Sequence, residues 1–473
     1  MVVSLLRRAL GAVTLAAALV TAACGDNAIA VVEVPDAAPP LDIVAALNAL
    51  PGVRAIERVS SEPGTRTIRI EVDQPVDHDD PGKGTFVQHL TLVHRDPAAP
   101  MILATTGYND YYGDYQVELT GELQANQVII EHRYFLPSRP SPADWTLLTI
   151  AQAAADHHHV VELLKPLYRG PWISTGASKG GMTSIYHRRF YPDDVDGTVA
   201  YVAPISFGAP DPRYTPFVDA IGTAGCRDAL AAISIEMLAH RRAMLETRAA
   251  AQLGHSYTRI KLGPAVESAV DSLAWAFWQY GGVSHCPSVP APSASDDAVW
   301  AFLTAWSPVS DSDDASTQQF EPYYFQAAWQ LGFPVGDDAF LQPYLIYGAA
   351  DYAGITPLGV AIPAYDPTVM QDIDTWVRTE GDRILFIYGE FDPWTGGAFD
   401  LGTNPGLARF VAPEGNHGSG LLQLSPADRA TAYATLTEWT GVTPVSAGAT
   451  ARARRPIERV PPAALSALRL RAR

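Results

Sequence analysis

Positively charged residues are scarce in this chain of 473 residues. Lysine and arginine together number 33 against 51 aspartate and glutamate residues, which leaves a formal net charge of −18 at pH 7. Binding to the phosphate backbone of a nucleic acid needs an excess of positive charge, so we do not expect nucleic acid as a partner. Charged residues make up 18% of the sequence and hydrophobic residues 47%, which indicates a folded globular protein with one large domain and an insertion, or with two domains.

The hydrophobic N-terminal segment is too short to span a membrane comfortably. It has Arg7 and Arg8, then a short apolar stretch, then small residues up to Cys24. This layout predicts an export signal over residues 1–24. The letters VTAAC also resemble a bacterial lipoprotein processing site, in which the cysteine is lipidated, and an ordinary signal peptide cleaved nearby is the alternative. We expect an exported protein of the cell envelope, either secreted or held at a membrane only through a lipid on Cys24.

Cysteine is almost absent, with Cys24, Cys226 and Cys286 the three examples. If Cys24 carries a lipid, an even pair remains in an oxidising compartment, where a disulfide persists. We therefore predict a disulfide between Cys226 and Cys286. Two separately buried thiols are the alternative, because pairing geometry cannot be read from a sequence.

The chain alternates between strand-like and helix-like patterns over its first half. A small, proline-rich segment over residues 25–40 is typical of a flexible linker. β-branched and aromatic residues then predict four strands, within residues 65–76, 85–95, 100–108 and 126–135. A helix-like segment, a short apolar run, a glycine-rich turn, another helix and another strand follow. This alternation predicts a mostly parallel sheet with helices on both faces.

The alternation stops near residue 207, which indicates an insertion. Residues 207–374 read as helical and aromatic, so we predict an inserted helical cap domain there. Apolar strands resume afterwards, so the α/β core is predicted to comprise residues 41–206 and 375–445. The tail over residues 446–473 has seven arginines between Ala449 and the end of the chain and is predicted to be disordered.

One serine lies among glycines between a predicted strand and a predicted helix. Gly176-Ala177-Ser178-Lys179-Gly180 fits the G-x-S-x-G pattern, in which a nucleophile is held on a sharp strand-to-helix turn. The small neighbours relieve steric crowding, and the helix N-terminus stabilises developing negative charge. Ser178 is therefore the predicted nucleophile, and a glycine-rich turn without chemistry is the alternative.

A serine nucleophile needs a base and a carboxylate that orients the base. In α/β-hydrolases the order along the chain is serine, then aspartate or glutamate, then histidine. Asp392 and His417 follow Ser178 in that order, each just past a late strand. Glu390 and Asp400 are rivals for the acid, but Asp392 lies in the turn after the strand.

The tetrahedral intermediate of such a reaction needs backbone amides that stabilise its oxyanion. The N–H of Lys179, directly after the nucleophile, is one predicted donor. The other is expected from the loop after the third strand of the core, around Gly107 or Tyr108, with Tyr108 preferred. The same loop carries Asp110 and Asp114.

No metal or organic cofactor is expected. Three consecutive histidines, His157 to His159, point about 100° apart on a helix and do not converge on one ion, so they are interpreted as surface residues. The tryptophans of the cap, Trp275 among them, are expected mostly in the core, with one or two lining an apolar subsite.

The segment STGASKGGMTSIYHRRFYPDDVDGTVAYVAPIS resembles the nucleophile region of secreted bacterial serine peptidases of the Streptomyces tripeptidyl aminopeptidase type. A second segment, VIIEHRYFLPSRP, resembles the strand and loop that they share with lysosomal Pro-Xaa carboxypeptidase and dipeptidyl peptidase II. The similarity extends from about Thr67 to about Gly441. It implies an α/β-hydrolase fold with a helical cap, the same roles for Ser178, Asp392 and His417, and release of short peptides, tripeptides foremost, from a free N-terminus.

An aminopeptidase of this kind must recognise the ammonium group of its substrate, for which a carboxylate is the natural partner. Glu131, Asp110 and Asp114 are the candidates, and Glu131 is favoured because it lies at a strand end. A structural ion pair between Glu131 and Arg133 is the alternative. Two other functions remain open: a carboxylesterase or lipase on the same fold, and a non-catalytic surface binding protein with a vestigial triad.

Overall fold

The computed structural model describes residues 42–60, 63–110, 115–336, 339–445 and 462–472. The predicted signal peptide with Cys24, the predicted linker and Asp114 lie outside these residues. Residues from Ile43 onward form one compact unit, and the description that follows concerns that unit alone. In the described part of the chain, no helix has both the length and the apolar character needed to cross a membrane.

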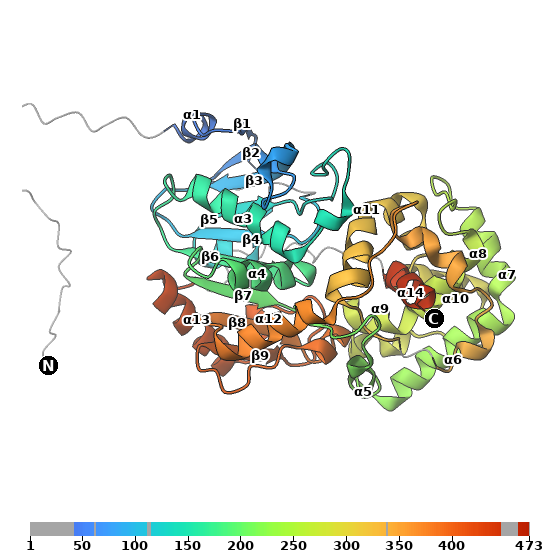
Figure 1. Cartoon of the computed structure of the whole chain (residues 1–473). Coiled ribbons are helices and arrows are strands. Elements are labelled where there is room, and N and C mark those ends of the chain that lie inside the picture. Colours follow the sequence, from blue (N-terminus) through green and yellow to red (C-terminus); the bar gives the residue numbers. More distant parts are fainter. Residues whose placement is uncertain (1–41, 61–62, 111–114, 337–338, 446–461, 473) are drawn as a thin grey trace, which may run out of the picture. The chain divides into compact units, whose positions relative to one another are not determined.

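A nine-stranded sheet forms the centre of the unit, in the order β1-β2-β3-β5-β4-β6-β7-β8-β9 (Figure 1). Its strands are β1 (Val53–Arg58), β2 (Arg66–Pro75), β3 (Thr85–His94), β4 (Met101–Thr105), β5 (Asn126–Ile130), β6 (Trp172–Ala177), β7 (Gly197–Tyr201), β8 (Ile384–Gly389) and β9 (Leu407–Ala412). The pairs from β1 through β3 to β5 are antiparallel, and all pairs from β5 to β9 are parallel.

The predicted strands are all present, and β1 is an additional strand that the sequence analysis missed. Only Val53 and Ala55 of β1 are buried, so its pattern is dominated by outward-facing charged residues. Arg54 of this edge strand pairs with Glu71 at 3.0 Å and with Asp73 at 2.8 Å on β2. Charged side chains are common on edge strands, where they discourage pairing with another chain.

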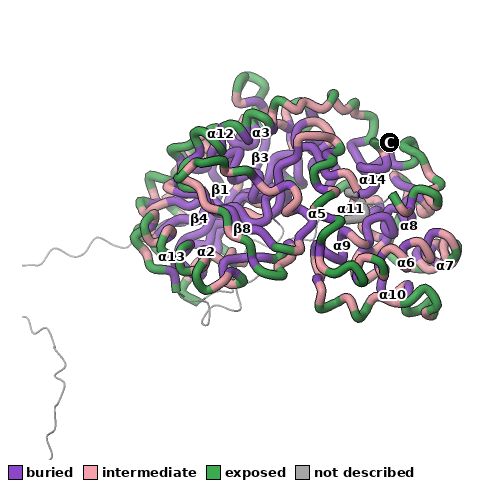
Figure 2. The backbone as a smooth tube through the Cα atoms, turned by 90° about the horizontal axis from the view of Figure 1, so that it is seen from below, coloured by how far each residue is buried: buried purple, intermediate pink, exposed green. Residues whose placement is uncertain are grey.

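Helices cover both faces of the sheet, as predicted. The covering helices are α1 (Ile43–Asn48) and α3 (Ile150–Leu164) on one face, and α2 (Glu118–Glu122) and α13 (Pro426–Thr440) on the other. Neighbouring residues of one strand point to opposite faces: Leu103 packs with α3 and Ile102 packs with α2 and α13. Figure 2 shows the strands as largely buried. The strand order, with β4 beyond β5 and a parallel half flanked by helices, is that of the α/β-hydrolase fold.

Helices α4 (Lys179–Phe190) and α12 (Pro367–Thr379) also belong to the helical layer of the sheet. They contact each other, and the Tyr186 hydroxyl of α4 donates to Met370 Sδ of α12 at 3.4 Å. The C-terminal boundary predicted for the cap, residue 374, therefore falls inside α12. Helix α12 is amphipathic, like the helices predicted for the cap. Its sequence pattern therefore did not distinguish it from the cap.

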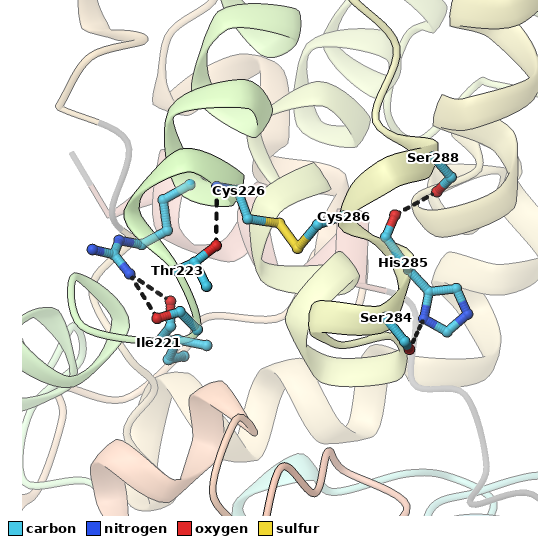
Figure 3. The surroundings of a disulfide bond; sticks show 9 residues. Ile221, Thr223, Cys226, Ser284, His285, Cys286 and Ser288 are labelled. Atoms are coloured by element: carbon cyan, nitrogen blue, oxygen red, sulfur yellow. Dashed lines mark hydrogen bonds between the residues drawn. A yellow bond between two sulfur atoms is a disulfide. The ribbon is translucent and has the colours of Figure 1, made fainter.

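The segment between β7 and β8 carries a group of helices that pack on one another (Figure 1). These are α5 (Thr215–Val218), α6 (Ala224–His240), α7 (Arg242–Ala250), α8 (Leu262–Asp271), α9 (Leu273–Tyr280), α10 (Asp296–Trp306) and α11 (Asp314–Gln326). The structure joins Cys226 of α6 to Cys286 in a disulfide, the pairing that the sequence predicted (Figure 3). The bond links the start of α6 to the short 3-10 helix over Val283–Ser288, so it ties together two segments of the cap.

The prediction of a disordered tail is wrong for residues 462–472. Helix α14 (Pro462–Arg471) packs against α8, α9 and α11, with Ala467, Leu468 and Leu470 buried. The alternation of leucine with arginine hid this apolar surface, because arginine normally indicates contact with water. Arg469 is instead 5% exposed, with its guanidinium stacked on an aromatic ring.

Candidate active site

Ser178 lies on a sharp turn between β6 and α4, as the glycine pattern predicts. Its backbone has φ 56° and ψ −128°, in the region that residues with a side chain rarely adopt. The turn is packed so closely that a Cβ on Gly176 would lie 2.4 Å from Gly180 C, and one on Gly180 would lie 2.4 Å from Thr105 O. The Ser178 N–H donates to Tyr201 O at 2.9 Å, which fixes the strained residue against β7. The side chain is 8% exposed.

Asp392 and His417, far apart in sequence, meet beyond the ends of β8 and β9. His417 Nδ1 lies 2.7 Å from Asp392 Oδ2, and both side chains are buried. An ionised carboxylate only accepts hydrogen bonds, so Nδ1–H donates and Nε2 remains as an acceptor. Within the described residues, the buried Nε2 has no hydrogen-bond partner.

The backbone of the site is held by neighbouring segments. Asp392 Oδ1 accepts from the Trp394 N–H at 3.2 Å, so the carboxylate is fixed by its own turn. The His417 N–H donates to Gln279 O of α9 at 2.9 Å. A cap helix therefore positions the loop that carries the histidine.

The rivals for the acid have other partners. Glu390 Oε2 accepts from the Glu414 N–H at 2.7 Å, and Asp400 accepts from a backbone N–H two residues further along its own turn at 3.0 Å. The structure thus brings Asp392, and not the rivals, to the histidine. The position in the turn after the strand was the signal that singled out Asp392 in the sequence.

Lys179 connects the nucleophile turn to the loop after β4. Its Nζ donates to Gly107 O at 2.7 Å and lies 5.7 Å from the ring centre of Tyr108 and 5.6 Å from that of Phe135. The side chain is 2% exposed, and burial lowers the pKa of Lys179 well below its usual range. The glycine pattern predicts a role only for the backbone N–H of Lys179, so this side-chain contact was not predicted.

The loop itself lies directly against the nucleophile turn. Gly107 has φ 70°, and a Cβ there would lie 2.7 Å from Gly180 N. Only glycine allows this approach. The Tyr108 N–H donates to Thr106 Oγ1 at 3.1 Å, so this predicted oxyanion donor is engaged within its own loop in the conformation described.

Glu131 is buried at the end of β5 and binds backbone rather than a cation. Oε1 accepts from the Ser138 N–H and Oε2 from the Asp110 N–H, both at 3.0 Å. Burial raises the pKa of Glu131 to about 7. The suggested ion pair with Arg133 is wrong, because Arg133 instead forms a bidentate pair with Asp156, with both N···O distances 2.7 Å.

Asp110, another candidate for the ammonium partner, contacts side chains of β2 and β3. Its Oδ2 accepts from the Thr91 hydroxyl at 2.6 Å and lies 3.9 Å from Arg69 Nη1. Both contacts are to β2 and β3, which the strand order separates from β6 by β5 and β4. The Asp110 carboxylate is thus engaged by side chains of β2 and β3.

The three consecutive histidines have separate partners. His157 Nδ1 donates to Ala153 O at 2.5 Å, His158 Nδ1 lies 2.9 Å from Asp194 Oδ2, and His159 Nδ1 lies 2.8 Å from Gln74 Oε1. The prediction of a surface position is wrong for His157, which is 1% exposed because α3 packs against α4. Burial lowers the pKa of His157 to about 4. Across the described ranges, no group of three or more His, Cys, Asp or Glu residues is arranged to hold a metal ion.

Comparisons with known proteins identify the family of this chain. The family model for PS-10 peptidase S37 matches residues 36–466. The prolyl tri/tetrapeptidyl aminopeptidase of Streptomyces mobaraensis is 38% identical over 455 residues, which cover 94% of each chain. The lysosomal Pro-X carboxypeptidase of Homo sapiens is 35% identical over 99 residues, 19% of this chain and 20% of that protein.

Among solved structures, proline iminopeptidase from Mycobacterium smegmatis aligns with 78% of this chain and 98% of its own, at 12% identity and a TM-score of 0.36. The full-length match to the family model and the 38% identity to the Streptomyces enzyme confirm the resemblance read from the nucleophile region. This chain belongs to the S37 family of peptidases.

Proposed function

We propose that this protein is an exported serine exopeptidase that removes short peptides, tripeptides foremost, from the free N-terminus of its substrates. The observation that carries the proposal is the buried hydrogen bond between His417 and Asp392, in a chain that also presents Ser178 on a strained strand-to-helix turn. The printed name of the Streptomyces relative, a prolyl tri/tetrapeptidyl aminopeptidase, supports the substrate class.

In the proposed reaction, Ser178 Oγ attacks the scissile carbonyl carbon while His417 Nε2 takes the hydroxyl proton. Asp392 stabilises the imidazolium through Nδ1 and stays ionised. The tetrahedral intermediate then collapses: the C–N bond breaks, His417 gives its proton to the leaving amine, and an acyl-enzyme remains on Ser178. Water attacks the acyl group by the same route in reverse, which releases the short peptide with a new carboxylate.

The Lys179 N–H, at the start of α4, and an amide of the loop after β4 are proposed to stabilise the oxyanion. For the Tyr108 N–H to take part, it must exchange its bond to Thr106 Oγ1 for one to the substrate oxygen. The bond from Lys179 Nζ to Gly107 O supports the loop in the required position. The side chain of Lys179 is therefore proposed as a positioning group.

The cap between β7 and β8 is proposed to select the peptides that reach Ser178. Export is proposed from the sequence of residues 1–24, with Cys24 as the candidate lipid attachment site. The disulfide between Cys226 and Cys286 supports export, because such bonds persist outside the reducing cytosol.

The test uses protein that starts after Cys24, incubated with defined peptides in free and N-acetylated forms, with products identified by mass spectrometry. Tripeptides released from the free peptides alone are the expected result, and Ser178→Ala protein is the control for contaminating peptidases. Cleavage of neither form, together with hydrolysis of a simple ester, would contradict the exopeptidase and indicate an esterase.

A further inference from the structure

A cationic side chain lies inside the cap, delivered by the last helix of the chain. Arg469 of α14 has its guanidinium carbon 4.4 Å from the ring centre of Trp275. Its Nε donates to Pro334 O at 3.1 Å. One turn earlier on α14, the Ser466 hydroxyl donates to the Asp271 carboxylate of α8. An aromatic face, a carbonyl and a carboxylate thus gather around one face of α14.

This arrangement is close to the proposed catalytic residues. Trp275 contacts Trp394 edge-on with their ring centres 5.4 Å apart, and the ring centres of Trp394 and His417 are 6.1 Å apart. The steps from Arg469 to His417 are therefore 4.4, 5.4 and 6.1 Å long. An extended peptide spans at most about 3.3–3.6 Å per residue, so three or four residues cover roughly 10–14 Å. By these steps the Arg469 guanidinium lies at most about 16 Å from the His417 ring, and a short peptide bound at Ser178 must bridge this distance for its N-terminus to reach the groups around α14.

The charge of Arg469 also affects a tyrosine on α11. Burial raises the pKa of Tyr323 on α11, and the charge of Arg469 opposes that rise. The ring of Tyr323 lies 5.8 Å from that of Tyr108, in the loop beside the nucleophile turn. The charge of Arg469 therefore acts on a residue whose ring packs against Tyr108 of the loop beside the nucleophile turn.

Arg469 contacts an aromatic ring and a carbonyl, the neighbouring Ser466 contacts a carboxylate, and these are the groups that an ammonium group requires. A cation is attracted to the face of a tryptophan ring, and it forms strong hydrogen bonds to a carboxylate and to carbonyl oxygens. The carboxylate favoured from the sequence is less suitable, because both oxygens of Glu131 accept backbone N–H groups. The cap offers Asp271 instead.

We propose that Asp271, the ring of Trp275 and the carbonyl of Pro334 form the receptor for the N-terminal ammonium of the substrate, and that α14 occupies this receptor as an intramolecular plug. The proposal rests on the exopeptidase function proposed above. In the structure, the Arg469 guanidinium occupies the position proposed for the substrate ammonium beside Trp275. The Ser466 hydroxyl supplies the hydrogen bond to Asp271 that the substrate would otherwise donate.

The plug must leave for a peptide to bind, and the contacts of α14 make this feasible. Among the described side chains of α14, Ala467, Leu468 and Leu470 supply the apolar packing against cap helices, and Ser466, Arg469 and Arg471 supply the polar contacts. Ordering a ten-residue helix opposes that gain through lost conformational entropy. A peptide that satisfies Asp271 and Trp275 can therefore compete with α14.

The first experiment compares the mature chain with a chain that ends at Val445, both assayed on a free tripeptide-releasing substrate and on a small uncharged ester. We expect truncation to raise kcat/KM for the peptide at least tenfold and to change ester hydrolysis less than threefold. A synthetic peptide of residues 462–473 should then inhibit the truncated enzyme competitively. Unchanged peptide cleavage without inhibition by the synthetic peptide would overturn the plug and leave the peptidase function intact.

The receptor is tested in the truncated chain by Asp271→Asn. We expect KM for the free peptide to rise tenfold or more, with ester hydrolysis unchanged, while Asp297→Asn on the surface of the cap serves as the matched control. An equal loss on peptide and ester would refute the receptor. Loss of peptide cleavage by every chain, with the ester still hydrolysed, would instead refute the peptidase function and the receptor with it.

A second pair of variants covers the case in which truncation unfolds the protein, as judged by thermal melting. In the full chain, Arg469→Ala should raise kcat/KM for the free peptide, because the cation leaves Trp275. Arg471→Ala is the matched control, since that side chain contacts Thr356 Oγ1 instead. Equal behaviour of the two variants would refute the plug.

Discussion

The sheet and the cap differ in how they bring functional residues together. Each proposed catalytic residue lies at the end of a parallel strand or in the turn after it, where a local pattern of apolar residues and glycines marks its place. The groups that Arg469 and Ser466 of the last helix contact come from α8, α9 and the segment after α11. The proposed chemistry is thus marked by local patterns in the sequence, whereas the proposed selectivity depends on contacts between distant segments.

The largest expected effect concerns Ser178, which follows a strand of the sheet. Ser178→Ala should lower kcat for a peptide by about 10⁴- to 10⁶-fold, because the acyl-enzyme cannot form. Peptide binding, measured by titration of the inactive variant, should persist because the cap is unchanged. Substantial turnover by the purified variant would show that another residue is the nucleophile.

Asp392→Asn should lower kcat by about 10⁴-fold, since an amide in place of the carboxylate favours the wrong tautomer of His417. Glu390→Gln is the control and should retain activity within about threefold, because that carboxylate contacts a backbone N–H instead. Steady-state kinetics on one peptide substrate compares the two. A larger loss from Glu390→Gln would reverse the assignment of the acid.

The disulfide between Cys226 and Cys286 should contribute to the stability of the cap. Cys226→Ser should lower the free energy of unfolding by about 2–4 kcal/mol, because the disulfide closes a loop of 60 residues in the unfolded chain. Urea denaturation measures the change, with the variant Cys286→Ser as a partner that must give the same value. Unaltered stability in both variants would mean that the bond does not form.

The free energy of unfolding should fall at acid pH because of His157, which is buried between α3 and α4. The pKa of His157 is about 4 in the folded protein against an ordinary value near 6.5, so between these values the unfolded chain binds a proton that the folded chain does not. Its contribution is complete above pH 6.5 and is lost as the pH falls toward 4, at about 1.4 kcal/mol per unit and about 3 kcal/mol in total.

The free energy of unfolding of the wild-type protein and of the His157→Gln variant, measured by denaturation across this pH range, isolates the slope of stability against pH that His157 contributes. Glu131 acts in the opposite sense: its raised pKa, about 7, means that stability present at low pH is lost as the pH rises from 4.5 through 7. Glu131→Gln should remove that opposing slope. Identical slopes in the wild-type protein and His157→Gln would contradict the buried neutral histidine.

The smallest expected effect comes from the side chain of Lys179. Lys179→Met should lower kcat by about 10- to 100-fold with little change in KM, since the loop amide loses its support and oxyanion stabilisation weakens. Lys165→Met is the matched control, because Lys165 Nζ also donates to a backbone carbonyl, that of Asp193 at 3.2 Å, but at the surface. Partial recovery in Lys179→Arg would separate positioning from a general packing defect.

Much of the sheet could be predicted because its elements are specified by short patterns. The β-branched runs of β2 to β5 and the glycines around Ser178 each reflect a constraint that acts within a few residues. β1 was missed because the charges on an edge strand obscure its period. The pairing of His417 with Asp392 was predictable from order alone, since the ends of parallel strands meet at one edge of the sheet.

By itself, the sequence determined the fold class, the family resemblance and the order of Ser178, Asp392 and His417, because these depend on local periodicity and on backbone constraints. Only the tertiary structure decided that Lys179 Nζ holds the loop of Gly107, that Glu131 binds backbone amides, and that α14 lies inside the cap. The physical reason is that burial of a charged side chain depends on partners distant in sequence, which composition and spacing do not report.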